Sequence, residues 1–150
     1  MSEFSWTLRI TATDNEAAHV VVRRHQFAVG RPLSFDAEYQ HVTALEYVLG
    51  ALGAEIVNGL RLSAKRRRIE LDEIEAVVDG ELDNPLTYLE VVGAEGHPGL
   101  TRVVVKVYVA SPHDEQTWRT LWDETRERLP LVRTFSGALT LTVELKVAPG

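Results

Sequence analysis

The sequence predicts one α+β domain with the element order ββ(β)αββαβ, and three patterns support this prediction. Apolar and polar residues alternate in 5–13 and in 138–147, which is the two-residue period of a half-buried strand. Residues 43–66 repeat apolar side chains at helical spacing, and 100–109 is dense in valine. With 150 residues the chain has the size of a single domain, and most of its strands are expected to pair antiparallel.

The N-terminal part, residues 1–42, is predicted to be a β-meander. Its first strand, 5–13, places Trp6, Leu8 and Ile10 on one face. A second strand is expected over 19–26, with Arg23 and Arg24 on an exposed edge, and a short third one over 27–29.

Residues 43–66 form the strongest predicted helix. Thr43 and Glu46 have the spacing of a capping box, in which the side-chain oxygen of each residue accepts a hydrogen bond from the backbone N–H of the other. Basic residues 65–68 complement the helix dipole at the other end, where we expect them to be exposed to solvent. The helix is expected to be buried, with another backbone close to the side that carries its small residues, which are Gly50, Gly53, Ala54 and Val57.

The C-terminal part is predicted to contain a strand pair within 71–109, a second helix over 111–129 and a last strand over 138–147. Pro130 is expected to end the second helix, and Trp118 and Trp122 to lie on its buried side.

Composition excludes several classes of function. The chain has no cysteine, so it has no disulfide, thiolate metal site or cysteine nucleophile. With 16 basic and 22 acidic residues, its net charge of −6 does not suit nucleic acid. It has no apolar run of roughly 20 residues to span a membrane and no pattern of a secretion signal, so we expect a cytoplasmic location. The five histidines lack metal-ligand spacing, and no metal or cofactor is expected.

The order of elements and several local segments resemble the OsmC/Ohr family, bacterial proteins best known as thiol peroxidases that act on organic hydroperoxides. The most specific segment is LEYVLGALGA at 45–54, preceded by RPLSF at 31–35. It is similar to the family's stretch that leads into a long central helix. Further similar segments lie at 69–72, 80–83 and 133–134.

The resemblance implies an intertwined homodimer built around two central helices. Residues 1–42 would be exchanged with the partner subunit or packed on it. An apolar helix with a glycine-bearing face agrees with this implication, because a single subunit of this size buries such a helix with difficulty.

The resemblance also places the family's two redox cysteines in this chain, at Glu55 and at Leu129. The arginine that supports the family's thiolate falls near Glu38, and the carboxylate that orients the arginine falls at Leu45, next to Glu46. Peroxide reduction in the family passes through thiolate, sulfenic acid and disulfide, and none of these can form without cysteine sulfur. We therefore expect no thiol peroxidase activity.

Glu55 is the main candidate for a functional side chain, because a carboxylate on this helix must be paired, solvated or protonated. It is either a structural glutamate or an acid/base or ligand-binding group in the former cysteine pocket. Glu46 is better explained as a helix cap than as a catalytic group. The candidate pocket comprises Glu55, Glu46, Glu38, His41 and Leu129.

Two function classes follow. The first is a homodimeric binding or structural protein that takes a small apolar ligand, with a role in bacterial stress physiology. The second is a non-redox enzyme in which Glu55 moves a proton, with His41 or Glu38 as partner. A third hypothesis is a residual role in the response to hydroperoxides or oxidative stress.

Overall fold

The computed structural model of the chain describes residues 3–12 and 14–149. These residues form two compact units, Met1–Val48 and Leu49–Gly150, and the long helix α1 (Ala44–Arg66) begins in the first and continues through the second. Thr13, the last residue of the first predicted strand, lies outside the described residues.

The first unit contains the predicted β-meander. Its three strands are neighbours in sequence order and pair antiparallel. The second predicted strand was too long at its C-terminal end, because Arg23 has φ 53° and turns the chain at 23–24. Arg23 and Arg24 therefore belong to a hairpin turn and not to an exposed edge strand. The strands are β1 (Arg9–Thr11), β2 (Ala18–Val22) and β3 (His25–Val29).

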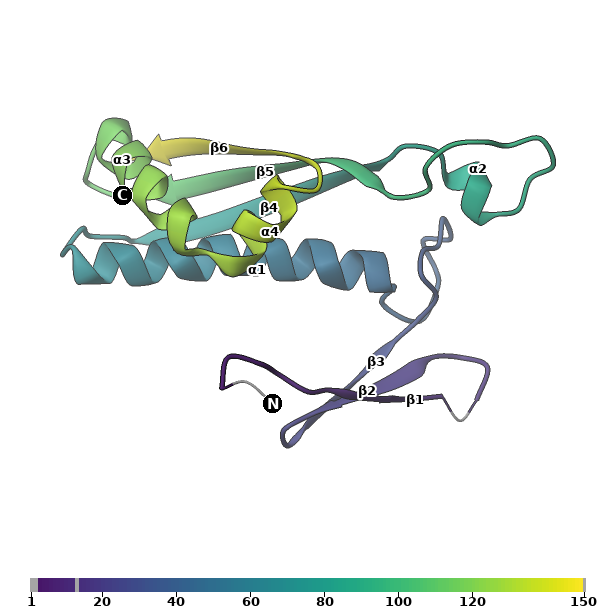
Figure 1. Ribbon diagram of the computed structural model, residues 1–150. Coiled ribbons are helices and arrows are strands. Elements are labelled where there is room, and N and C mark those ends of the chain that lie inside the picture. Colours follow the sequence, from purple (N-terminus) through teal and green to yellow (C-terminus); the bar gives the residue numbers. More distant parts are fainter. Residues whose placement is uncertain (1–2, 13, 150) are drawn as a thin grey trace. The chain divides into compact units, whose positions relative to one another are not determined.

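The second unit contains a sheet in which β5 is the central strand. β4 and β5 pair antiparallel, as expected, whereas β5 and β6 pair parallel. A parallel neighbour requires a long crossover connection, and the helical segment between β5 and β6 supplies it (Figure 1). The strands are β4 (Glu73–Leu82), β5 (Leu100–Ala110) and β6 (Thr140–Ala148).

The crossover differs from the single helix predicted for 111–129. It consists of α3 (Glu115–Thr125), a 3₁₀ turn η1 (Arg126–Arg128) and α4 (Pro130–Ser136). Pro130 was expected to end a helix, but it begins one. Proline forces the preceding Leu129 into an extended conformation (φ −91°, ψ 115°) and is itself well suited to the first helical position.

A short helix, α2 (Pro85–Tyr88), was also not predicted. Asn84 caps it by accepting a hydrogen bond from the backbone N–H of Leu86. Gly93 and Gly96, in the loop that follows, have φ 84° and 122°, a region of backbone conformation that glycine adopts at no steric cost.

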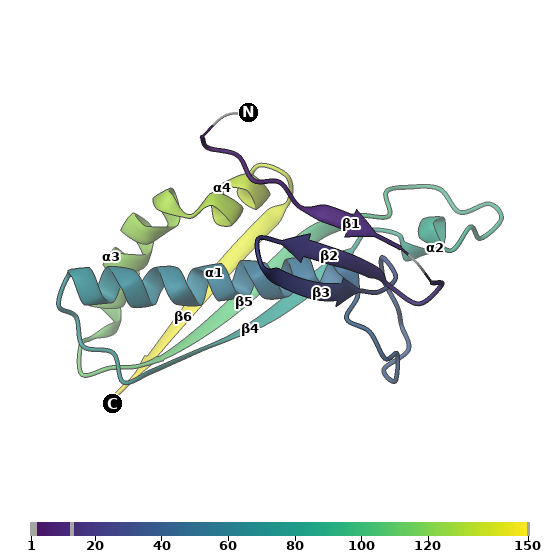
Figure 2. The same cartoon turned by 90° about the horizontal axis from the view of Figure 1, so that it is seen from below.

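The core of the second unit lies between one face of its sheet and helices α1, α3 and α4. Figure 1 shows α1 and α4 on the same side of the sheet, whereas α2 lies beyond the ends of β4 and β5. Figure 2 shows the strands of this sheet crossing α1 obliquely. The opposite sheet face carries the alternate, more exposed residues of each strand. Trp118 and Trp122 belong to the core, as predicted. The buried apolar residues of this core come from α1, β5, α3, α4 and β6: Leu52, Ile56, Leu60, Ala64, Val103, Val105, Val107, Val109, Trp118, Leu121, Trp122, Val132 and Leu145.

Burial of α1 is confined to one face. A Cβ on Gly53 would lie 2.6 Å from Cγ2 of Val78, so a side chain of β4, rather than a backbone, approaches this glycine. A Cβ on Gly50 would meet no described atom within 4 Å. Within the described chain, the close backbone neighbour expected along this side of α1 is therefore not found.

Candidate functional site

Glu55, the main candidate from the sequence, lies half-buried in the middle of α1 and reaches across to α4. Its Oε2 accepts a hydrogen bond from the backbone N–H of Leu131 at 2.9 Å, and its Oε1 accepts one from that of Val132 at 3.0 Å. The two oxygens of one carboxylate thus satisfy two consecutive amides that are 76 and 77 residues away in the sequence.

These two amides belong to the first turn of α4, where N–H groups have no partner inside the helix. The N-cap residue is Leu129, which offers no side-chain acceptor, and α4 has no cap hydrogen bond of its own. Glu55 therefore caps α4 from another helix. A negative side chain at this end also interacts favourably with the helix dipole.

Leu129, the second position that the resemblance singled out, packs one helical turn further along α1. A Cβ added to Gly59 would lie 2.7 Å from Cδ2 of Leu129, so the missing side chain of Gly59 leaves the space that Leu129 occupies. The structure thus brings Glu55 and Leu129 to the same stretch of the interface between α1 and the crossover.

The next turn of α1 continues this interface with a buried polar contact. Ser63 is 5% exposed, and Thr125 is 1% exposed. Their hydroxyls are 2.8 Å apart, and Thr125 Oγ1 also lies 2.7 Å from the carbonyl oxygen of Leu121. Arg128 donates a longer hydrogen bond, 3.4 Å, to Ser63 Oγ. Positions 55, 59 and 63, spaced by four, form one face of α1 that contacts residues 125–132 by a cap, an apolar contact and hydroxyls.

Glu46 has the capping geometry that the sequence predicted. Its Oε1 accepts hydrogen bonds from the backbone N–H of Thr43 at 3.0 Å and from the Thr43 hydroxyl at 2.9 Å. In return, Thr43 Oγ1 accepts from the Glu46 backbone N–H at 3.1 Å. The backbone hydrogen bond from Thr43, followed by the one from its hydroxyl, holds the pKa of the Glu46 carboxyl below its ordinary value.

His41 lies in the loop before α1 and, together with Glu46, lines a hollow of about 340 Å³ in the first unit. His41 Nε2 is 3.8 Å from Glu16 Oε2, and its ring meets the ring of Tyr39 edge to face. Glu38 is exposed, and its backbone N–H donates to Asp36 Oδ1. Glu38 is not among the residues that line this hollow.

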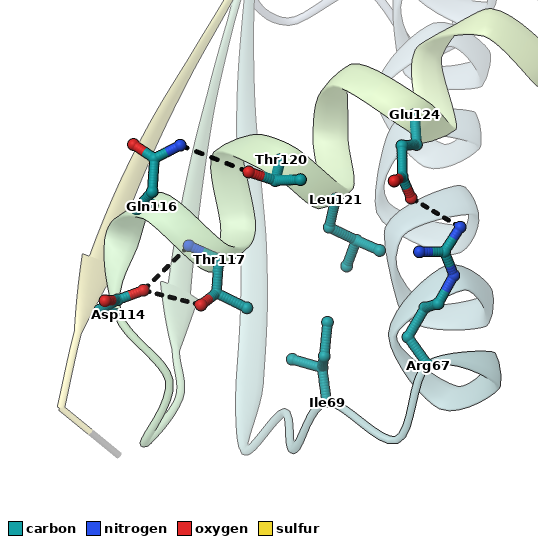
Figure 3. A pocket seen from close by; sticks show the side chains of 8 residues that line it. All are labelled: Arg67, Ile69, Asp114, Gln116, Thr117, Thr120, Leu121 and Glu124. Carbon is teal, nitrogen blue, oxygen red and sulfur yellow. Dashed lines mark hydrogen bonds and ion pairs between the residues drawn. The ribbon is translucent and has the colours of Figure 1, made fainter.

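Another hollow, of about 330 Å³, lies between the C-terminal end of α1 and α3 (Figure 3). Ile69 and Leu121 face each other across it, and an ion pair of 2.7 Å between Arg67 and Glu124 closes one side. Neither Glu55 nor Leu129 lines this hollow, nor the larger one at residues 58–71 on α1 and the segment after it.

Among residues 3–12 and 14–149, His, Asp and Glu side chains form no group that could hold a metal ion. The helices of this same part of the chain include none that is long and apolar enough to cross a membrane.

The sequence singled out Glu55 as a candidate but did not indicate the backbone groups of α4 that it contacts. The available signal was Pro130 at the start of a helix, preceded by a leucine that cannot cap. A helix start without a local cap indicates an acceptor from elsewhere in the fold.

A protein-family model described as OsmC-like protein matches residues 37–144. No curated protein matches the chain. Among solved structures, an OsmC-like protein from Mycoplasma pneumoniae has a TM-score of 0.77 at 17% identity, covering 98% of each chain.

Two further structures carry names that refer to hydroperoxides. The organic hydroperoxide resistance protein OsmC of Legionella pneumophila has a TM-score of 0.67 at 14% identity and covers 99% of both chains. The organic hydroperoxide resistance protein OhrB of Bacillus subtilis has a TM-score of 0.62 at 21% identity, covering 94% of this chain and 98% of its own. At these identities the likeness concerns the fold.

Proposed function

Because the chain belongs to the OsmC-like protein family, we propose that it is a homodimeric member that binds a small apolar ligand or serves a structural role, without thiol peroxidase activity. The absence of cysteine carries this proposal. Thiol-dependent peroxide reduction oxidises a thiolate to a sulfenic acid, which then condenses with a second thiol to a disulfide. No residue of this chain can take either role.

The contacts of Glu55 support the structural part of the proposal. Both of its carboxylate oxygens accept hydrogen bonds from α4, and Leu129 fills the space beside Gly59. The resemblance places the family's cysteines at Glu55 and Leu129. In this chain Glu55 caps α4 and Leu129 makes an apolar contact, and both connect α1 to the crossover. A non-covalent connection takes the place that a reversible covalent one has in the cysteine-bearing members.

The peroxidase assay uses an organic hydroperoxide with a dithiol reductant. We expect no turnover above the buffer rate for the chain as it is. A Glu55→Cys/Leu129→Cys variant is the informative companion, because the two thiols should form an intramolecular disulfide on oxidation if the positions correspond. Saturable activity of the cysteine-free protein would refute the proposal, and failure of the variant to form the disulfide would refute the correspondence.

The homodimer is proposed from apolar surface in both units. Trp6, Leu8 and Ile10 alternate along the N-terminal segment and are 80%, 43% and 60% exposed. On α1, Ala54 is exposed beside the open side of Gly50. Contiguous exposed apolar side chains commonly mark an interface, and closed two-fold dimers are the commonest soluble assemblies.

Light scattering after size exclusion should give the mass of two chains. Ala54→Arg should shift the mass toward one chain, because it places a charge in the proposed interface. Gln116→Arg, at an exposed position of α3, is the matched control and should leave the mass unchanged. A wild-type mass of one chain across the accessible concentration range would refute the homodimer.

An acid/base or ligand-binding role for Glu55 is tested separately. A ligand thermal-shift screen compares the wild type with Glu55→Gln. A ligand that stabilises the wild type more than the variant supports a binding role for this carboxylate. Ligands that stabilise both proteins equally restrict Glu55 to its structural role.

A further inference from the structure

The hollow between the C-terminal end of α1 and α3 lies within the second unit (Figure 3). Its volume of about 330 Å³ is at the lower end of the range of small-molecule sites, which is roughly 300–1,000 Å³. Among the described residues, its lining includes neither Gly50 nor Ala54 nor any residue of 1–42, which are the parts assigned to the proposed homodimer. An inference drawn from this hollow therefore does not depend on the proposed function.

Two aliphatic side chains from distant parts of the sequence form the floor of the hollow. Leu121 lies on the buried side of α3, and Ile69 follows α1 and is partly buried. Arg68 has φ 56° and turns the chain at the end of α1, where the Ile69 backbone N–H donates to the carbonyl oxygen of Ala64. After this turn Ile69 faces Leu121, and Arg67 stands on the adjoining wall (Figure 3).

Asp114, the N-cap residue of α3, makes one end of the hollow acidic. Its Oδ1 accepts hydrogen bonds from the Thr117 backbone N–H at 2.9 Å and from the Thr117 hydroxyl at 2.7 Å. The backbone hydrogen bond, followed by the one from the hydroxyl, holds the pKa of the Asp114 carboxyl below its ordinary value. A carboxylate has about four acceptor positions, so two bonds from Thr117 leave room for a further donor.

Arg67 makes the opposite end of the hollow basic. Its Nη2 pairs with Glu124 Oε2 at 2.7 Å, and Figure 3 shows another nitrogen of the guanidinium group directed toward Leu121. A guanidinium group has five N–H donors in a fixed plane, so the pair with Glu124 leaves donors for a second acceptor. Positions 114 and 124 are separated by about 15 Å along the axis of α3. The hollow thus has an acceptor end, an aliphatic middle and a donor end.

From this arrangement we propose that the hollow binds a linear ω-amino carboxylate, in which roughly five methylene groups separate the ammonium from the carboxylate. The ammonium donates to Asp114, and the carboxylate accepts from Arg67. The methylene groups lie on Ile69 and Leu121, where they are removed from water. An extended chain of this length, with a hydrogen bond at each end, spans most of the distance along α3.

Ligands with a single charge fit the hollow less well. An alkyl carboxylate leaves Asp114 without a new partner and brings a third carboxylate to a lining that already holds Asp114 and Glu124. An alkyl amine leaves the free donors of Arg67 without an acceptor. Unpaired groups of this kind are what distinguishes a matched ligand from its analogues.

The probe is 6-aminohexanoate, titrated into the full chain while backbone amide shifts are followed by nuclear magnetic resonance. A ligand of this size in an open hollow is expected to bind in about the millimolar range. Saturable shifts should be confined to the amides of 67–69 and 114–124. Hexanoate and hexylamine each lack one charged group, and each should bind about fivefold more weakly, the upper end for an exposed charge contact.

Three variants at exposed positions separate the two ends of the hollow. Asp114→Asn keeps a side chain that caps helices but removes the charge, so it should weaken 6-aminohexanoate about fivefold without weakening hexanoate. Arg67→Gln should weaken 6-aminohexanoate and hexanoate but not hexylamine. Glu124→Gln releases Arg67 from its ion pair and should tighten 6-aminohexanoate about twofold. Circular dichroism verifies that the variants fold.

Matched controls remove one charge each outside the hollow. Asp123→Asn lies on α3 and Arg102→Gln on β5, and both positions are exposed and absent from the described lining. Both variants should bind 6-aminohexanoate as the wild type does. The proposal is refuted if Asp114→Asn and Arg67→Gln bind as tightly as these controls, or if hexanoate or hexylamine binds as tightly as 6-aminohexanoate. It is also refuted if the amides around the hollow show no saturable shift.

Discussion

Replacing Glu55 with alanine removes both acceptors of the first two free amides of α4 in a single step. A hydrogen bond to a charged group contributes roughly 1.5–3 kcal/mol, and the loss of a helix N-cap typically costs about 1 kcal/mol. Because Glu55 is only half-buried, water can reach the amides of Leu131 and Val132 in the variant and recover part of the loss. We expect the free energy of unfolding to fall by about 2 kcal/mol, between these limits.

Urea unfolding at one fixed chain concentration measures this difference, since association would make the apparent stability depend on concentration. Amide hydrogen exchange gives the local readout, because protection of Leu131 and Val132 should decrease more than that of β5. Glu75→Ala, at an exposed position of β4, is the control and should change stability by less than about 0.5 kcal/mol. The capping argument is wrong if Glu55→Ala behaves like this control and the two amides keep their protection.

The remaining predictions concern neighbouring turns of α1. Gly59→Ala gains up to about 1 kcal/mol of helix propensity but forces Leu129 to move, which typically costs roughly 1–3 kcal/mol, so we expect net destabilisation in urea unfolding. The double variant Gly59→Ala/Leu129→Ala should not show the clash in a double-mutant cycle, and additive effects would contradict the contact. For Glu46, the lowered pKa predicts a stabilising contribution that is complete above the unfolded-state pKa of about 4.3 and is lost as the pH falls through the lower folded-state value. The stability difference between the wild type and Glu46→Gln should therefore shrink with acidification, whereas a constant difference would exclude the carboxylate bond to Thr43 as its cause.

Local features of the fold were predictable because their partners are close in the sequence. The capping box joins Thr43 to Glu46 across three residues, and its hydrogen bonds form as the spacing predicted. The β-meander of the first unit and the start of α1 were also predictable, because their sequence patterns involve residues that are close along the chain. Arg23 at φ 53° was missed because a hairpin turn without glycine, asparagine or aspartate carries little signal.

Features that depend on distant partners were not predictable in the same way. Polarity alone left Glu55 open to a structural or an acid/base interpretation. The hydrogen bonds that it accepts from Leu131 and Val132 depend on the tertiary contact between α1 and the crossover. The parallel pairing of β6 with β5 likewise depends on how the crossover returns the chain, and a strand pattern has the same period in either direction.

The sequence by itself determined the chemistry that is absent. A chain without cysteine cannot pass electrons through a thiol, whatever its fold. The tertiary structure decided what the replacing residues do, because the function of a carboxylate depends on the groups that surround it. For Glu55 those groups are the free amides of a helix that only long-range packing brings within hydrogen-bonding distance.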